Sequence, residues 1–224
     1  MNSKKIIYTV CIAIATISTL NLSAQDVPVD KKAKDILDKL SVKTKSYTSI
    51  KADFTITIAN PAKKTSDTQS GTLEVKGDKY KLSIKGQDII SDGKVVWTYL
   101  KDANEVQINN VDNTSDDAIN PTTIFTIYEK GFKYAFQSET KKGTQTIETI
   151  DLFPLNPAKK KYHTVKLMID KAKNQITEFV VMMKDASTVT YTIKNFIPNV
   201  PVDDTTFTYN PKDHPGADVV DLRE

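Results

Sequence analysis

The chain has 224 residues, of which 39% are hydrophobic and 26% charged, a composition that excludes an intrinsically disordered protein. Its 31 Lys and Arg against 28 Asp and Glu leave a net charge of only +3. This gives no basis for a nucleic-acid partner, because a phosphate-binding face needs a concentrated basic patch. One Cys and two widely separated His leave little material for a Cys/His dyad or a His-rich metal site.

The first 24 residues have the three-part plan of a secretory signal peptide. Two lysines give a basic start, residues 6–22 are uncharged and mostly apolar, and Ala24 is a small residue before the polar chain resumes. We expect cleavage after Ala24, which leaves one mature, exported domain over residues 25–224. A bacterial lipoprotein needs a Cys directly after its cleavage site, and this chain has Gln25 there. The mature chain is therefore expected to carry no lipid of its own.

Two stretches predict helices. The first is an amphipathic helix over residues 30–46, with Asp30 as N-cap and lysines and aspartates on its polar face. The second is expected over residues 120–128, because Asn120-Pro121 combines a capping residue with a proline in the first turn. The apolar face of the first helix includes Ile36, Leu37 and Leu40, and that of the second Ile124, Phe125, Ile127 and Tyr128.

Outside these stretches the hydrophobic period is two, which is typical of half-buried strands. Residues 50–58 form the first such run, and the polar run over residues 63–70 is expected to end it. Asp92-Gly93 between two apolar runs is a strong hairpin signal. Further strands are expected at 71–76, 80–85, 89–90, 95–99, 106–108, 132–136, 145–153, 165–169, 175–183, 188–196 and 207–209.

About ten or eleven strands with two helices and no βαβ alternation indicate an α+β protein built on one strongly curved antiparallel sheet. Two helices are too few to cover the concave face of such a sheet. Either the strands close into a filled barrel, which periodicity alone favours, or the sheet stays partly open around an apolar cavity. In an exported protein, an apolar cavity would suggest a hydrophobic cargo.

A family resemblance bears on this choice. Residues 90–99, Ile-Ser-Asp-Gly-Lys-Val-Val-Trp-Thr-Tyr, resemble the periplasmic outer-membrane lipoprotein carriers (LolA-like), in which a strand ends in a Ser-Asp-Gly-Lys hairpin followed by x-x-Trp-x-Tyr. The similarity spans about 30–210, nearly the whole mature chain, and rests on the order and spacing of several segments. The other segments are 47–54, 71–75, 120–125 and 199–207.

The resemblance implies an unclosed antiparallel half-barrel of about 11 strands, covered by a helical lid. It implies a periplasmic carrier without catalysis, metal or cofactor, whose cavity holds the acyl chains of lipoproteins. Cargo would come from an inner-membrane lipoprotein-releasing ABC transporter and pass to the outer membrane, where a receptor could accept it. On this basis we expect the cavity to be lined by Phe54, Ile56, Tyr80, Leu82, Trp97 and Tyr99, and the lid to contribute Ile36, Leu40, Ile124, Phe125 and Tyr128.

One feature departs from the family pattern. Family members often carry an Arg-Pro pair near the end of the second strand, thought to hold the lid, whereas Arg223 is the only arginine of this chain. Lys76 is one candidate replacement, and the alignment could equally place Gly77 at that position. Lysine cannot make the planar bidentate contact of arginine. The sequence therefore does not identify the residue that would hold the lid closed.

Two other classes of function are alternatives to a carrier. A periplasmic protein-binding sensor or scaffold on the same half-barrel fold would use its surface rather than a cavity, so a filled interior would favour it. A hydrolase has weak support, because no Ser/His/Asp set can be assembled and both His163 and His214 fit surface positions.

Overall fold

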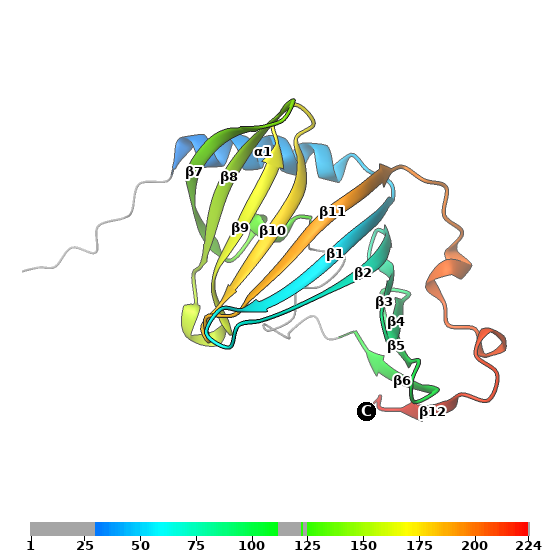
Figure 1. Cartoon of the computed structure of the whole chain (residues 1–224). Helices are drawn as coiled ribbons and strands as arrows, with labels where there is room; N and C mark the ends of the chain where they lie inside the picture. Colours follow the sequence, from blue (N-terminus) through cyan, green and yellow to red (C-terminus); the bar gives the residue numbers. More distant parts are fainter. Residues whose placement is uncertain (1–29, 112–121, 123–124, 224) are drawn as a thin grey trace, which may run out of the picture.

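The described part of the chain forms one curved sheet with a single α-helix on its concave side (Figure 1). The computed structural model describes residues 30–111, 122 and 125–223. The predicted signal peptide, Ile124 and the start of the predicted second helix at Asn120-Pro121 lie outside this part. Described strands number 12, in the order β12-β6-β5-β4-β3-β2-β1-β11-β10-β9-β8-β7. Because β12 and β7 are separate edges, the sheet is an unclosed half-barrel, as predicted.

The bounds of the elements are as follows. The helix is α1 (Lys31–Lys45), and the strands are β1 (Ile50–Asn60), β2 (Thr65–Lys76), β3 (Lys79–Ile84), β4 (Gln87–Ser91), β5 (Val95–Leu100), β6 (Glu105–Asn110), β7 (Phe132–Lys142), β8 (Gln145–Pro154), β9 (Tyr162–Asp170), β10 (Gln175–Met183), β11 (Thr188–Pro198) and β12 (Asp218–Asp221). Short 3-10 turns are η1 (Ile127–Glu129), η2 (Pro157–Lys159), η3 (Asp204–Phe207) and η4 (Pro211–Asp213).

The predicted first helix is confirmed, with Asp30 as its N-cap. One carboxylate oxygen of Asp30 accepts from the backbone N–H of Ala33 at 3.0 Å, and the other accepts from the N–H of Phe136 on β7 at 2.7 Å. These hydrogen bonds lower the pKa of Asp30. The residue therefore starts the helix and also fixes it to the sheet edge.

The concave face carries two hydrophobic clusters. The first lies under α1 and joins Ala33, Ile36, Leu37 and Leu40 to buried residues of β8, β9 and β10. The second covers β1, β2 and β3 and includes Phe125. Tyr191 and Ile193 of β11 pack against both clusters, so β11 is the seam between them.

Three predicted elements differ in the structure. Residues 65–70, expected to be a polar loop, are the first half of β2, where the Thr68 hydroxyl lies 2.9 Å from that of Thr57 on β1. Their polarity reflects exposure to solvent rather than the absence of a strand. Residues 207–209, expected to be a strand, are instead the end of η3 and an irregular segment. Of the expected second helix, the described part is a turn followed by the short η1.

The sequence also missed β12, which pairs in parallel with β6. It follows a segment, residues 199–217, that runs outside the sheet past β3 (Figure 1). The Asn104 side-chain amide donates to Gly216 O at 2.9 Å, and the Tyr99 ring lies 3.9 Å from that of His214. We call residues 199–221 the C-terminal strap, because these contacts fasten them to strands β5 and β6.

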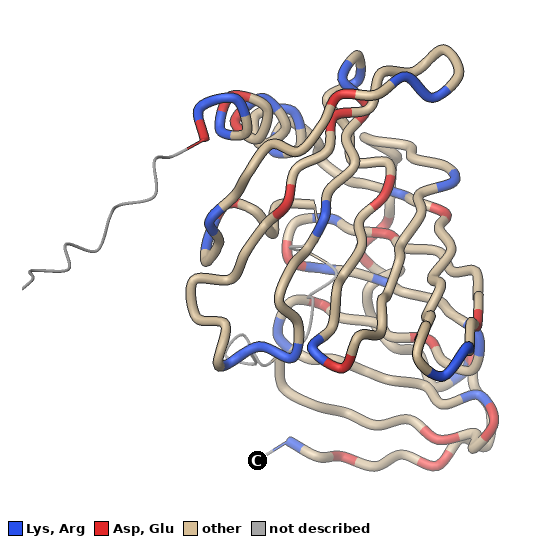
Figure 2. Tube along the Cα trace, turned by 60° about the vertical axis from the view of Figure 1, so that its left-hand side comes forward, with Lys and Arg blue, Asp and Glu red and all other residues tan. Residues whose placement is uncertain are grey.

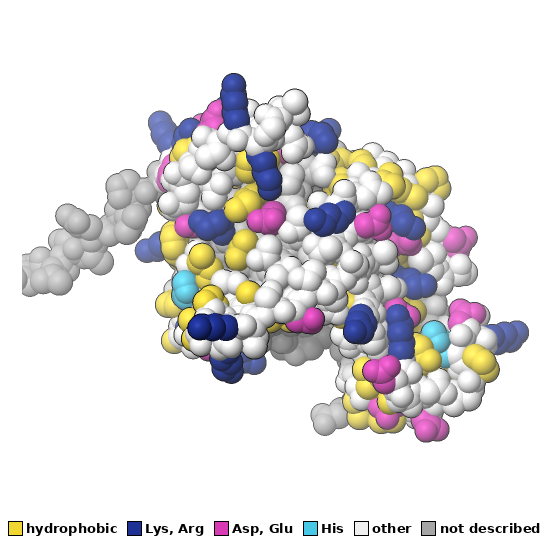
Figure 3. All heavy atoms as spheres, viewed as in Figure 1, with side chains coloured by type: hydrophobic (Ala, Val, Ile, Leu, Met, Phe, Trp, Pro, Cys, Tyr) yellow, Lys and Arg dark blue, Asp and Glu magenta, His cyan; other side chains and the backbone are white. Residues whose placement is uncertain are grey.

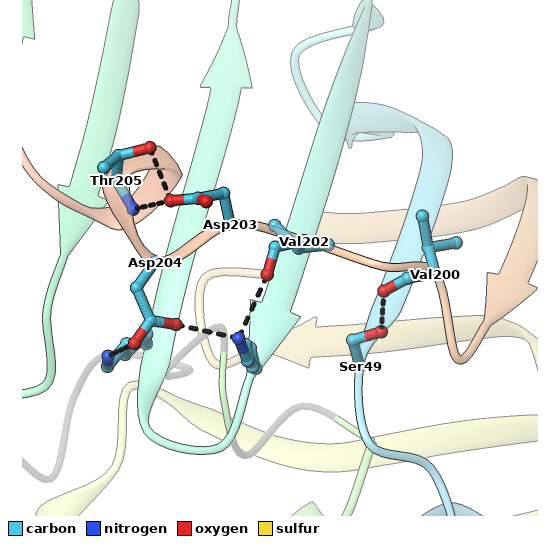
Figure 4. Close-up of polar contacts among 8 residues, drawn as sticks. Ser49, Val200, Val202, Asp203, Asp204 and Thr205 are labelled. Atoms are coloured by element: carbon cyan, nitrogen blue, oxygen red, sulfur yellow. Dashed lines mark hydrogen bonds and ion pairs between the residues drawn. The ribbon is translucent and has the colours of Figure 1, made fainter.

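Lys76 belongs to the fastening of this strap (Figure 4). Its ammonium group donates to Val202 O at 3.0 Å and to Asp204 at 2.8 Å, and Lys79 donates to the other oxygen of Asp204 at 2.7 Å. Both contacts of Lys76 go to the strap rather than to α1 or η1. The position at which a lid latch was considered therefore anchors the C-terminal strap.

Asp204→Asn is expected to loosen the start of the strap without unfolding the sheet. Lys76 and Lys79 hold the pKa of Asp204 at about 2, below its usual 3.8. A lowered carboxyl pKa stabilises the contact above pH 4, and this contribution is lost as the pH falls from 4 to 2. Amide NMR signals of residues 202–206 should shift over that range in the wild type, and hydrogen exchange there should be faster in the variant at pH 7.

The matched control for this experiment is Asp102→Asn, an exposed carboxylate in the turn after β5. It should leave exchange in the strap unchanged. Equal exchange in wild type and Asp204→Asn would contradict an anchoring role for the ion pairs. Because Asp204 is fully exposed, the melting temperature is expected to change little in either variant.

Candidate functional site

An apolar cavity of about 180 Å³ opens on the concave face, over β1, β2 and β3 and against β10 and β11. Every side chain that lines it is aliphatic or aromatic, and the tyrosine hydroxyl is the only polar group among them. The lining residues are Ala52, Phe54, Ile56, Leu73, Leu82, Ile84, Phe125, Phe179, Tyr191 and Ile193.

The strand register explains why these residues face the same space. Residues directly paired across neighbouring strands share a face of the sheet. One such row joins Ala52, Leu73 and Leu82, and the next joins Phe54, Gly71 and Ile84. Alternation along β1 then adds Ile56 to the same face.

Gly71 makes room in this wall. A Cβ at this position would lie 2.7 Å from Cζ of Phe54 and 2.8 Å from Cγ2 of Ile84, closer than real Cβ contacts allow. The ring of Phe54 therefore lies over the glycine backbone of β2. Without that gap the ring would have to stand further into the cavity.

The opposite wall is aromatic. The rings of Phe179 on β10 and Tyr191 on β11 stack at a centroid distance of 4.3 Å with 12° between their planes. Burial raises the pKa of the Tyr191 hydroxyl, so this group is neutral at physiological pH. The cavity thus offers dispersion and hydrophobic contact, and the part of the chain that the structure describes puts no charged side chain on its lining.

Phe125 closes the cavity from the side opposite the sheet. Its ring meets that of Phe196 edge-on at 5.6 Å, and Phe196 in turn lies 5.6 Å from the ring of Tyr47. Phe125 is 7% exposed although it precedes only the short η1 and not a long helix. It is therefore the one lining residue in the described part of the chain that no strand holds.

Four of the expected site residues line the cavity together: Phe54, Ile56, Leu82 and Phe125. Tyr80 lies in the same hydrophobic cluster but does not line the space. The expected lid residues Ile36, Leu40 and Tyr128 lie in the neighbouring cluster under α1. Ile124 lies outside the described residues.

Trp97 and Tyr99 lie on the other face of the sheet, contrary to expectation. Leu82 is in register with Ile89 and Thr98, so Trp97 and Tyr99 point away from the cavity. The Tyr99 hydroxyl donates to Asn104 at 3.0 Å, and its ring packs on the C-terminal strap at His214. Tyr99 therefore contacts the strap rather than the cavity.

Six lining residues were not among those expected. Ala52 follows from alternation along β1, and Leu73 and Ile84 follow once β2 and β3 are paired with it. Phe179, Tyr191 and Ile193 could not be assigned in this way, because β11 pairs with β1 across more than a hundred residues and β10 is joined to β1 only through β11. The missed residues are Ala52, Leu73, Ile84, Phe179, Tyr191 and Ile193.

Among residues 30–111, 122 and 125–223, no group of His, Cys, Asp and Glu side chains is placed to hold a metal ion. No helix there is long and apolar enough to span a bilayer.

Comparison with known proteins gives the family. The model described as "Outer membrane lipoprotein carrier protein LolA" matches residues 45–210, well over half of the chain. No curated protein matches. An uncharacterized conserved protein from Thermus thermophilus is similar in structure, with a TM-score of 0.57, 14% identity, and coverage of 85% of this chain and 99% of that chain.

A DUF1329 family protein from Desulfovibrio piger has a TM-score of 0.50 and 11% identity, covering 81% of this chain and 98% of that one. At such identities these two structures share the fold alone. The match to the family model is what assigns the family, since it covers both cavity walls from β1 to β11. The chain belongs to the LolA family of outer membrane lipoprotein carrier proteins.

Proposed function

We propose that this protein is a periplasmic carrier that binds the acyl chains of lipoproteins and moves them from the inner to the outer membrane. The observation that carries the proposal is the apolar cavity, whose lining holds no charged group among the described residues. Cargo would be received from an inner-membrane lipoprotein-releasing ABC transporter and delivered to an outer-membrane receptor or the membrane itself. The binding residues on this proposal include Phe54, Ile56 and Leu82.

The size of the cavity sets a condition on loading. At 180 Å³ the cavity is close to the roughly 150 Å³ that accepts a benzene-sized molecule and below the roughly 300–1,000 Å³ of larger ligand sites. A sixteen-carbon chain gains on the order of 12 kcal/mol gross when buried, which is enough to drive enlargement. The space must therefore grow when an acyl chain enters.

Phe125 is the residue best placed to move. The sequence suggested that both helical segments act as a lid, but α1 supplies no residue to the lining and is buried against β8, β9 and β10. Phe125 closes the cavity from a turn and touches Phe196 by its edge. We infer that Phe125 swings outward when cargo enters and that its closure over the empty cavity competes with the cargo.

Hydrogen exchange should separate the two segments. With acyl ligand bound, exchange at residues 125 and 126 is expected to rise, because the Phe125 contacts are lost, whereas α1 keeps its protection. The measurement is exchange mass spectrometry of the purified protein with and without 1-monopalmitoylglycerol. Equal protection of both segments in the two states would remove the lid from the proposal.

The cargo itself is tested in two steps. Mass spectrometry of the protein purified from its host should find bound lipid or an acylated lipoprotein. Depletion of the protein in that host should then leave lipoproteins in the inner membrane. A protein that carries no lipid and whose depletion leaves lipoprotein distribution unchanged would instead be a protein-binding sensor or scaffold.

A further inference from the structure

The wall of the half-barrel splits between β10 and β11. The two strands are paired only from Glu178–Thr192 to Met182–Thr188. Beyond Glu178 the start of β10 and the end of β11 diverge, as Figure 1 shows at their upper ends. Backbone pairing therefore does not seal the sheet there, although both strands continue for several residues.

A β-bulge marks the split on each strand. On β10 the register with β9 shifts between Ile176 and Glu178, which leaves Thr177 as the extra residue. On β11 the register with β1 shifts between Ile193 and Asn195, which leaves Lys194 as the extra residue. Bulges re-aim side chains and are frequent next to functional sites. Both extra residues line the hollow that the split leaves.

This hollow has a volume of about 460 Å³ and adjoins the apolar cavity. Ile193 lines both spaces, and the edge-on contact between Phe125 and Phe196 joins a residue of the cavity to one of the hollow. The two spaces are thus separated by side chains and not by paired backbone. Outward movement of Phe125 would bring them into contact.

Three lysines line the hollow: Lys142, Lys173 and Lys194. All three are exposed, and within the described part of the chain none of their ammonium groups forms an ion pair or a hydrogen bond. Figure 2 shows lysines at neighbouring hairpin tips above the sheet, and Figure 3 shows basic side chains beside hydrophobic ones on this face. One carboxylate, that of Glu178, also lines the hollow, and it accepts from the Thr192 hydroxyl at 2.9 Å.

We propose that the split between β10 and β11 holds the anionic head of an amphiphile whose acyl chain lies in the apolar cavity. The hollow is lined by three cationic groups and one carboxylate, so its net positive charge attracts an anion. Because Ile193 lines both the hollow and the cavity, that anion would lie next to the cavity. A carboxylate or a phosphate attached to an acyl chain has this chemistry. The inference rests on the proposed function, because it takes the acyl chain as already bound.

The test compares anionic and neutral ligands of one chain length. Dissociation constants of the full mature protein would be measured by calorimetry for palmitate, lysophosphatidylglycerol with a palmitoyl chain, and neutral 1-monopalmitoylglycerol. At low salt both anionic ligands are expected to bind roughly tenfold more tightly than the neutral one. The preference should vanish in 1 M salt, where charges are screened within about 3 Å.

Variants assign the preference to the lysines. The triple variant Lys142→Gln, Lys173→Gln and Lys194→Gln should lose the tenfold preference while it binds the neutral ligand as the wild type does. The control carries Lys31→Gln, Lys133→Gln and Lys212→Gln, the same change of charge at exposed lysines outside the hollow, and should keep the preference.

Each outcome decides the matter. Equal affinity of wild type for anionic and neutral ligands would overturn the head-group site and leave the carrier proposal standing. Failure of all three ligands to bind would overturn both. Inorganic phosphate should not compete with palmitate at equal concentration. If it does, the lysines bind a free anion, and the link between head group and acyl chain is wrong.

Discussion

Leu82→Glu is expected to weaken acyl-chain binding by on the order of a hundredfold while the protein stays folded. Leu82 lines the cavity from β3 but is only half-buried. A carboxylate is therefore tolerated there better than at its neighbour Leu73, which is 4% exposed. An incoming acyl chain would have to strip water from the new charge. Binding is measured with 1-monopalmitoylglycerol, whose neutral head avoids direct charge repulsion.

The matched control is Thr72→Glu, which introduces the same charge on the exposed outer face of β2. Its affinity should equal that of the wild type, since the charge is separated from the cavity by the sheet. Circular dichroism should show the same strand content in all three proteins. If Leu82→Glu bound the ligand as tightly as the wild type, the chain would not lie in this cavity, and the carrier proposal would lose its central observation.

Elements with strong local signals could be predicted from the sequence. Asp30 and the helical spacing of Ile36 and Leu40 placed α1 to within one residue at each end. Asp92-Gly93 placed the hairpin between β4 and β5, where Asp92 accepts from the N–H groups of Lys94 and Val95. Such turns form from the chemistry of a few adjacent residues, so no distant contact is needed to specify them.

Polar strands could not be predicted in this way. Hydrophobic alternation detects a strand with one buried face, and the first half of β2 is exposed on nearly all its positions. β12 has no buried position and exists because its backbone pairs with β6, more than a hundred residues earlier in the chain. Strands of this kind are specified by their partners and not by their own pattern.

The main error in the predicted site was the face of β5 to which Trp97 and Tyr99 were assigned. Trp97 and Tyr99 flank the polar Thr98, so alternation places the two rings on one face of β5. Alternation alone cannot say whether Leu82 lies on that face. That depends on the length of the turn after Ser91, because a change of one residue moves every side chain to the other face. The strap supplies the missing reason for their apolar character, since it covers the outer face at Tyr99.

Distant contacts also decide which residues near η1 belong to the lid and which to the core. Ile36 and Leu40 of α1 share a cluster with Tyr128, whereas Phe125, three residues earlier, faces the cavity. A helical face would have kept Phe125 and Tyr128 together, since residues three apart lie on one side. The turn before η1 separates them. One short segment therefore joins a fixed core to a residue placed to move.

Gly71→Ala is expected to destabilise the protein and to shorten the acyl chains that it accepts. The new Cβ would lie 2.9 Å from the backbone oxygen of Ser83, which cannot rotate away, and 2.7 Å from Cζ of Phe54, which can. Overpacking costs about 1–3 kcal/mol, more than the roughly 0.4–1 kcal/mol that replacing a glycine gains through the unfolded state. If the Phe54 side chain rotated to relieve this clash, its ring would move into the cavity. Urea unfolding and the affinities of a chain-length series measure the two effects.

A double-mutant cycle isolates the contact with Phe54. Phe54→Leu removes the atom nearest to the new Cβ, so Gly71→Ala should cost less in that background than in the wild type. Thr72→Ala, the adjacent exposed position, should change stability by no more than about 0.5 kcal/mol. If the stability losses of Gly71→Ala and Phe54→Leu were strictly additive, β2 would have to shift to admit the methyl group. The same would follow if the Gly71→Ala protein bound long acyl chains as tightly as the wild type. In that case the glycine would not define the cavity wall, and the volume available to cargo would have to be set by Phe125 alone.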